Sequence, residues 1–200
     1  GIHVHIREGS AAHNLKDIVE GIVRTGIDTE YFSFCTDDKH IEDILRDGHI
    51  SYNVKLAVSL GMNPVQAIKM ATINTAKCYG LKHLGAISPG FQADFVVLDN
   101  LQDLNVTDVF YKGKLVDRNA PIRVKTCGRA LKHTVHLDKV KAEQFVLPIG
   151  KKKTHVIGIN PSQITTEDLA VSLQPAANYV PADGYSKVAA VERHHNTGKI

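Results

Sequence analysis

The stretch YFSFCTDD, at residues 31–38, decides the fold class. Its residues 31–35 are apolar or small, as is typical of a buried strand, and the polar residues 36–38 end that strand. A second strand is predicted at residues 2–7, where apolar and polar side chains alternate. Between the two strands, apolar residues recur with helical spacing over residues 15–23. A strand–helix–strand unit of this kind predicts an α/β protein with parallel strands.

The predicted helices begin and end at recognisable signals. Ser10 is predicted to cap the first helix, and Gly26 stands where a left-handed residue would end it. Asn63 followed by Pro64 is a helix start, because asparagine caps well and proline suits the first helical position. Further helices are expected at residues 41–45, 54–60 and 64–76. Residues 1–80 are therefore predicted to consist of β/α units.

The pattern changes after residue 80. Glycine and proline interrupt the chain at Gly85, Pro89 and Gly90, and the pair Lys112-Gly113 is a hairpin-turn signal. Short strands are expected at residues 93–99, 106–111 and 114–116. This segment is predicted to be β structure.

From about residue 121 the signals are weaker. Strands are predicted at residues 133–136 and 154–159. Thr165 and Thr166 either cap a helix or lie in a loop. The lysine run at 151–153 is interpreted as a solvated loop, with an interaction patch as the alternative.

Composition bounds the class of protein. The chain has 200 residues and a formal net charge of +3, which does not suggest nucleic-acid or membrane binding by bulk attraction. With 43% hydrophobic and 22% charged residues it resembles ordinary globular proteins. No apolar run approaches a membrane span, and residues 1–10 lack the pattern of a secretory signal. The three widely spaced cysteines suggest a reduced, cytoplasmic setting. Because the sequence opens inside a strand without Met, we expect a partial chain.

Two groups of residues at the predicted strand ends could carry chemistry. Asp37 and Asp38 follow a strand, where parallel β/α proteins place active sites, so either could bind a metal or transfer protons, or merely cap the next helix. Glu8 and Ser10 stand at the end of the other strand, beside Arg7, and could contact a small polar substrate or pair with neighbours.

Histidines form two further candidates. His3 and His5 lie on one face of the predicted strand, about 6.6 to 7 Å apart along it, and could chelate one metal or be two half-buried core residues. His194 and His195 near the C-terminal end have no third ligand at helical or strand spacing. An isolated pair of either kind is a weak motif.

Three segments carry a resemblance to a known family. The segments IREGSAA (residues 6–12), CTDDKH (35–40) and LGAISPGFQAD (84–94) resemble the bacterial-type adenine deaminases of the amidohydrolase superfamily, which are metal-dependent hydrolases. The resemblance continues weakly through residues 188–198. It implies the C-terminal part of a (β/α)8 TIM-type barrel in residues 1–80, with strands seven and eight at 2–7 and 31–35. A β-sandwich segment would follow at 81–120, and a linker with the start of an extra α+β C-terminal domain at 121–200.

The resemblance also implies a reaction and a metal. In this family the metal centre takes an Asp after the eighth strand, which corresponds to Asp37, whereas its HxH pair lies on the first strand and does not correspond to His3 and His5. Asp37 is therefore expected to be a metal ligand and the proton-transferring group in the deamination of adenine to hypoxanthine. Glu8 and Ser10 are expected to contact the purine. The metal centre would contain Mn or Fe, or else Zn, and would be binuclear in the intact enzyme.

The resemblance also implies binding partners, and two alternative functions remain open. The family favours homo-oligomers, adenine is the expected substrate, and neither nucleic acid nor a membrane is expected as a partner. One alternative is another amidohydrolase acting on a cyclic amide or an amino sugar. The other is a non-catalytic remnant or binding module, since the chain taken alone has too few ligands for the family's metal centre.

Overall fold

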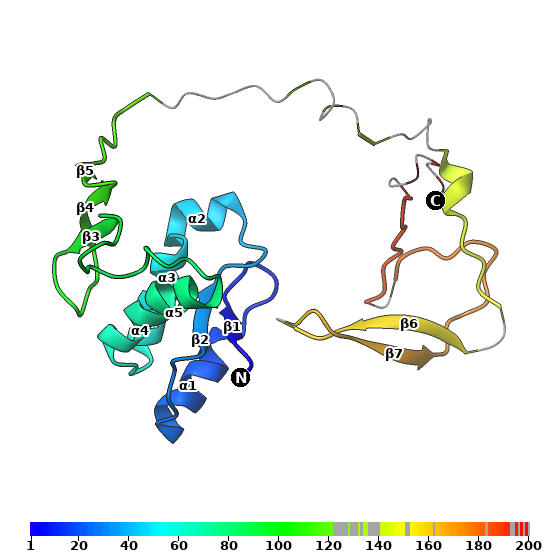
Figure 1. The fold of residues 1–200 in the computed structure, drawn as a ribbon. Helices are drawn as coiled ribbons and strands as arrows, with labels where there is room; N and C mark the ends of the chain where they lie inside the picture. The colour runs from blue at the N-terminus through cyan, green and yellow to red at the C-terminus, as the bar shows by residue number, and fades with distance from the viewer. Residues whose placement is uncertain are drawn as a thin grey trace. The chain divides into compact units, whose positions relative to one another are not determined.

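The computed structural model describes residues 1–121, 128, 132, 134–135, 141–150, 153–161, 163–182, 184–192, 195, 197 and 199. The chain divides into two compact units, residues 1–119 with 159–166, and residues 120–158 with 167–200. Figure 1 labels the helices and strands of both. The predicted strand at 133–136 falls largely outside the described residues, as do Cys127, two of the three lysines at 151–153, and His194.

The first unit opens with the predicted strand–helix–strand arrangement. Its elements are β1 (Val4–Arg7), α1 (Leu15–Thr25) and β2 (Phe32–Cys35). The two strands pair in parallel, with Val4 opposite Phe32 and Arg7 opposite Cys35. Gly26 ends α1 in the left-handed conformation, with φ of 65°. The α/β unit predicted from the sequence is therefore confirmed.

The predicted cap of α1 is wrong. The helix begins at Leu15, five residues after Ser10, and Asn14 takes the N-cap position. Residues 8–13 instead form a turn in which Glu8 bridges His13, and the Gly9 N–H donates to the carbonyl of Ala12 at 3.0 Å. The sequence pattern had assigned these residues to the start of the helix.

Four helices follow β2: α2 (Ile41–Asp47), α3 (Ile50–Ser59), α4 (Pro64–Ala71) and α5 (Ile73–Cys78). Asn63 caps α4 as predicted, because its side-chain oxygen accepts the N–H groups of Val65 and Gln66. The single helix expected over 64–76 is wrong, since the backbone leaves the helical region at Thr72, with φ −130° and ψ −93°. Beyond this break, the side-chain amide of Asn74 donates to the carbonyls of Thr29 and Phe32 at 2.8 and 3.0 Å. These tertiary bonds, which no local pattern encodes, hold α5 against the start of β2.

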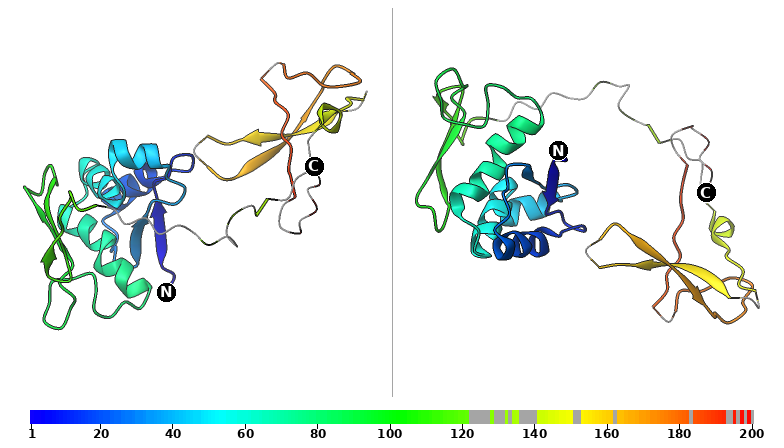
Figure 2. Two further views of the ribbon diagram at one scale, coloured as in Figure 1. Left: turned by 90° about the horizontal axis from the view of Figure 1, so that it is seen from above. Right: turned by 60° about the horizontal axis from the view of Figure 1, so that its bottom comes forward.

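The core lies on one face of the two-stranded sheet. Ile6 and Phe34 point from this face into a cluster completed by helix and loop residues. Its other buried members are Leu15, Val19, Ile22, Val54, Ala57, Met62, Ala67, Met70 and Leu104. The opposite face carries His5 beside Ser33 and Arg7 beside Cys35. Figure 2 shows two further views of the helices gathered about the strands.

A small antiparallel sheet completes the first unit. Its strands are β3 (Phe95–Leu98), β4 (Val106–Tyr111) and β5 (Lys114–Leu115). Lys112 and Gly113 both have positive φ, of 50° and 73°, as a two-residue type I′ turn requires. The Asp94 carboxylate accepts the Lys112 N–H at 2.7 Å and so holds this turn. The hairpin predicted from the sequence is confirmed.

The described residues after 121 form a single-turn 3₁₀ helix, η2 (Ala142–Phe145), and two paired strands, β6 (Thr154–Ile159) and β7 (Thr166–Val171). The expectation of a helix or loop after Thr165 is wrong, because this segment pairs with β6. Gly158 permits the pairing, since a Cβ on it would stand 2.8 Å from Leu169 Cδ1. No helix in the described part of the chain is long and apolar enough to cross a membrane.

Candidate active site

The two parallel strands end together and bring the predicted site residues to one edge. Arg7 and Cys35 are register partners at the last position of each strand, and the Glu8 N–H donates to the Cys35 carbonyl at 3.1 Å. Glu8 and Asp37 therefore follow directly from neighbouring strand ends. Carboxyl ends of parallel strands are where β/α proteins place their functional side chains.

Asp37 presents its carboxylate at this edge. Its backbone is left-handed, with φ of 51°, a conformation that aspartate tolerates better than most residues. The side chain is 46% exposed, and one carboxylate oxygen lies 3.4 Å from the Arg7 guanidinium. Asp37 is thus turned out of the strand direction and stays accessible, as a ligand or proton carrier needs to be.

Asp38 is held by the first loop. Its carboxylate accepts the Ala11 N–H at 3.1 Å. Some desolvation raises the pKa of Asp38, but hydrogen bonds from the backbone N–H groups of Ala11, Ala12 and Ser10 outweigh it, so the net pKa lies below the ordinary value. Asp38 therefore joins the loop after β1 to the loop after β2, and its carboxylate serves structure.

Ser10 makes a second link between the same loops. Its hydroxyl accepts the His40 N–H at 2.8 Å and donates to the Asp43 carboxylate. This hydrogen bond from Ser10 is the largest cause that lowers the pKa of Asp43; desolvation opposes it, and Arg46 assists it. The segments 6–12 and 35–40, which are far apart in sequence, thus interlock at the strand ends.

Glu8 lies between the strand end and the start of α1. One of its oxygens accepts the Leu15 N–H at 3.4 Å. Desolvation raises the pKa of Glu8, although that hydrogen bond, His13 and Lys39 act in the opposite direction. Glu8 is thus a half-buried carboxyl that holds its proton more tightly than a solvated one.

Sequence reasoning missed two polar groups beside this edge. The Lys39 Nζ lies 4.0 Å above the Tyr52 ring and finds no hydrogen-bond partner among the described residues. Asn53 is fully buried on α3 and donates to the Cys35 carbonyl at 2.9 Å, while its side-chain oxygen is left without a partner in the described structure. No sequence signal pointed to Asn53, which lies one residue before the helix predicted at 54–60, whereas α3 begins at Ile50.

The predicted histidines are placed differently. His3 and His5 lie near Cys78, with their rings 5.2 Å apart, at the beginning of β1 and not at the edge that carries Asp37. His195 contacts Glu192 at 3.2 Å in the second unit.

Asp37 is a suitable metal ligand at the carboxyl edge. Asp37 offers a solvent-accessible carboxylate, a donor that divalent ions of the first transition row accept. Across the residues that the structure describes, no group of three metal-ligating side chains includes Asp37. Asp37 therefore fits as one member of a larger ligand set.

Comparison with known proteins identifies the family. Residues 2–116 match the amidohydrolase family, and the chain belongs to it. Over 200 residues it is 50% identical to an adenine deaminase of Desulfitobacterium hafniense (strain Y51), covering 99% of this chain and 35% of that protein. It is 40% identical over 211 residues to an adenine deaminase of Desulforamulus reducens, covering 100% of this chain and 36% of that protein.

The chain thus spans about a third of the length of the curated relatives it matches. Among solved structures, a β-aspartyl dipeptidase of Fervidobacterium islandicum AW-1 matches with a TM-score of 0.45 and 18% identity, covering 57% of this chain and 33% of that one. That likeness is too slight to bear on the fold or the activity. The predicted resemblance to adenine deaminases in the amidohydrolase superfamily is confirmed by the sequence relatives.

Proposed function

We propose that the chain is part of an adenine deaminase, which converts adenine and water to hypoxanthine and ammonia. The observation that carries the proposal is Asp37, an accessible carboxylate directly after the second of two parallel strands in an amidohydrolase chain. The match to an adenine deaminase extends over nearly the whole chain, which supports the assignment of substrate.

Asp37 is the proposed metal ligand and proton carrier. A divalent metal bound in such a centre would lower the pKa of a bound water molecule and so supply hydroxide at neutral pH. The Asp37 carboxylate accepts the proton of the attacking oxygen and delivers it to the C6 amino group as the C–N bond breaks. Ammonia then leaves in place of the far more basic amide ion. A positioned proton carrier of this kind contributes about 10² to 10⁴ in rate.

Arg7 positions Asp37. With 18% of its side chain exposed, the guanidinium is largely buried and lies 3.4 Å from the carboxylate. The contact fixes the direction in which the carboxylate points. Only one carboxylate oxygen contacts Arg7, so the other is available to a metal or to water.

Glu8 and Ser10 are the proposed purine contacts. Glu8 stands next to Arg7 at the strand end, where its carboxyl group can form a hydrogen bond with the polar edge of a purine. Ser10 already donates to Asp43, so a lone pair of its hydroxyl oxygen is the group it offers to a substrate.

The intact protein would hold the metal centre in a complete barrel. In this proposal residues 1–80 are the last two β/α units, 81–120 are a β-sandwich segment and 121–200 begin a C-terminal domain. The centre would be binuclear with Mn or Fe, or else Zn, in a cytoplasmic homo-oligomer. The further metal ligands would come from residues outside this chain.

The test is ammonia release from adenine with metal content measured on the same sample. It compares the 200-residue chain with the protein at the full length that its gene encodes. We expect activity and bound metal in the full-length protein. A panel of purines, cyclic amides and acetylated amino sugars serves as the control for substrate class. Hydrolysis of a cyclic amide or an amino sugar without ammonia release from adenine would contradict the proposal.

A further inference from the structure

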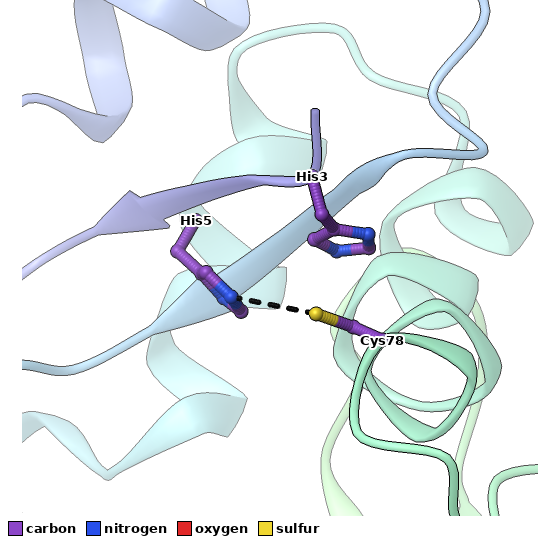
Figure 3. Close-up of side chains that lie close together, drawn as sticks. All are labelled: His3, His5 and Cys78. Carbon is purple, nitrogen blue, oxygen red and sulfur yellow. Dashed lines mark hydrogen bonds between the residues drawn. The ribbon is translucent and has the colours of Figure 1, made fainter. Parts of the chain in front are cut away.

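Three metal-ligating side chains meet on the first unit, apart from the edge that carries Asp37. They are His3, which precedes β1, His5 on β1, and Cys78, the last residue of α5. One ligand atom of each lies within 4.8 Å of those of the other two. Figure 3 shows both imidazole rings and the thiol directed toward one another from the strand and the helix.

The closest contact in this group already has the dimensions of metal coordination. His5 Nε2 lies 3.7 Å from Cys78 Sγ. In a tetrahedral zinc site, bonds of about 2.0–2.1 Å to nitrogen and about 2.3 Å to sulfur place these two atoms roughly 3.6 Å apart. His5 and Cys78 are exposed and His3 is partly exposed, so surrounding atoms leave room for small adjustments. Small side-chain rotations therefore bring all three within bonding distance of one ion.

Ser33 orients both histidines. It is completely buried, and its hydroxyl oxygen lies 3.1 Å from His3 Nε2 and 2.8 Å from His5 Nδ1. A serine oxygen has two lone pairs and can accept an N–H from each ring. In that arrangement His5 Nε2, which faces the thiol, is the ring nitrogen left to bind a metal. Ligating histidines are typically held in this way through their other ring nitrogen.

This cluster is separate from the proposed catalytic edge. Ser33 is the register partner of His5, and it lies two residues before Cys35, the last residue of β2. Two residues of strand extend about 7 Å, and Asp37 lies beyond that strand end. An ion held by His3, His5 and Cys78 therefore binds near the beginning of the strands.

We propose that His3, His5 and Cys78 form a binding site for a zinc-class divalent cation, with water as the fourth ligand. Two imidazoles and a thiolate suit Zn²⁺ and Co²⁺ and do not suit Mg²⁺ or Ca²⁺, which take oxygen ligands. Binding converts the Cys78 thiol to a thiolate and releases its proton to solvent. The bound ion would tie β1 to α5, so it would be structural.

The test is titration of the full chain with Co²⁺, followed by absorption spectroscopy. A thiolate bound to Co²⁺ gives a near-ultraviolet charge-transfer band, and four-coordinate geometry gives intense visible bands. We expect both bands to saturate at one equivalent and to disappear on addition of Zn²⁺. Cys78→Ser should abolish the charge-transfer band, while Cys35→Ser, a matched change at the other described cysteine, should retain it.

A second variant tests the role assigned to Ser33. Ser33→Ala keeps all three ligands, so we expect the charge-transfer band to remain while Co²⁺ affinity falls about 10- to 100-fold. Absence of the band in the unmodified chain, or its survival in Cys78→Ser, would overturn the proposal. Because the readout is the spectrum and not adenine turnover, failure here and failure of the proposed deaminase activity are distinguishable.

Discussion

The Asp38 carboxylate occupies the space in which a side chain on Gly9 would stand: a Cβ built on Gly9 would lie 1.7 Å from Asp38 Oδ1. This contact joins the segment REGSAA to the segment CTDD. The first loop must lack a side chain at Gly9 so that its N–H groups can surround the carboxylate from the second loop. The edge that presents Asp37 therefore depends on a packing relationship between two loops.

Gly9→Ala should destabilise the first unit by about 1–3 kcal/mol, because the new methyl group displaces Asp38 from its N–H donors. Gly21→Ala is the matched control, since nothing lies within 4 Å of a Cβ there and Gly21 is inside α1. Alanine in a helix interior should stabilise by about 0.5–1 kcal/mol. Urea unfolding measures both changes. Equal stability of the two variants would contradict the account. So would a Gly9→Ala substitution that cost as much unfolding free energy in an Asp38→Ala background as it does in the unmodified chain.

Gly85 and Gly90 separate backbone strain from crowding. Both have positive φ, of 87° and 83°, but only a Cβ on Gly85 would meet other atoms: 2.8 Å from Ala76 Cβ and 2.9 Å from Ile73 Cα. Gly90→Ala should therefore cost about 1–2 kcal/mol of unfolding free energy from backbone strain alone. Gly85→Ala should cost more, because α5 would have to move. A lower urea midpoint for Gly90→Ala than for Gly85→Ala would show that the close approach of Gly85 to α5 does not contribute to the cost of substitution.

Glu8→Gln should change the pH dependence of stability. The pKa of Glu8 is raised by desolvation above its ordinary value of 4.5. The native state therefore binds this proton more tightly than the unfolded state, and the free energy of unfolding falls as pH rises from about 4.5 through the folded pKa. Glutamine keeps the acceptor for the Leu15 N–H but does not titrate. The variant should gain stability over the unmodified chain as pH rises and match it in acid. A difference that is constant with pH would contradict this.

Ser10→Ala should act in the opposite direction through Asp43. Loss of the Ser10 hydroxyl removes the largest cause of the lowered pKa of Asp43, so that pKa should move back toward 3.8. A depressed carboxyl pKa contributes stability that is present above the unfolded pKa and lost as pH falls through the folded one. The variant should therefore be less stable than the unmodified chain above about pH 4 and converge with it in stronger acid. Carboxyl NMR titration measures the pKa. Ser59→Ala, which removes only a bond to the Leu56 carbonyl, should leave it unchanged.

The elements with strong local signals could be predicted from the sequence. Asn63 with Pro64, Gly26 and the turn at Lys112 each depend on backbone preferences of adjacent residues, and each is where the pattern placed it. The failures involve distant partners. Ser10 has the composition of a helix cap, but its hydroxyl contacts residues about 30 positions away.

The candidate site shows the same division. The position of Asp37 after a buried strand was visible in the sequence. The different roles of Asp37 and Asp38 were not, because they depend on the loop after β1, which surrounds the Asp38 carboxylate and leaves the Asp37 carboxylate exposed. The approach of Cys78 to His5 spans 73 residues and has no local signature.

Asp37→Asn in the protein at the full length that its gene encodes tests the central claim most directly. Asparagine tolerates the left-handed backbone and keeps a neutral contact for Arg7, but it cannot accept the transferred proton. Asp17→Asn, the same chemical change on the exposed surface of α1, is the control. We predict that Asp37→Asn loses nearly all adenine turnover, about 10² to 10⁴ in kcat, while Asp17→Asn retains it. An Asp37→Asn protein that kept more than about a tenth of the unmodified rate would remove Asp37 from the catalytic role.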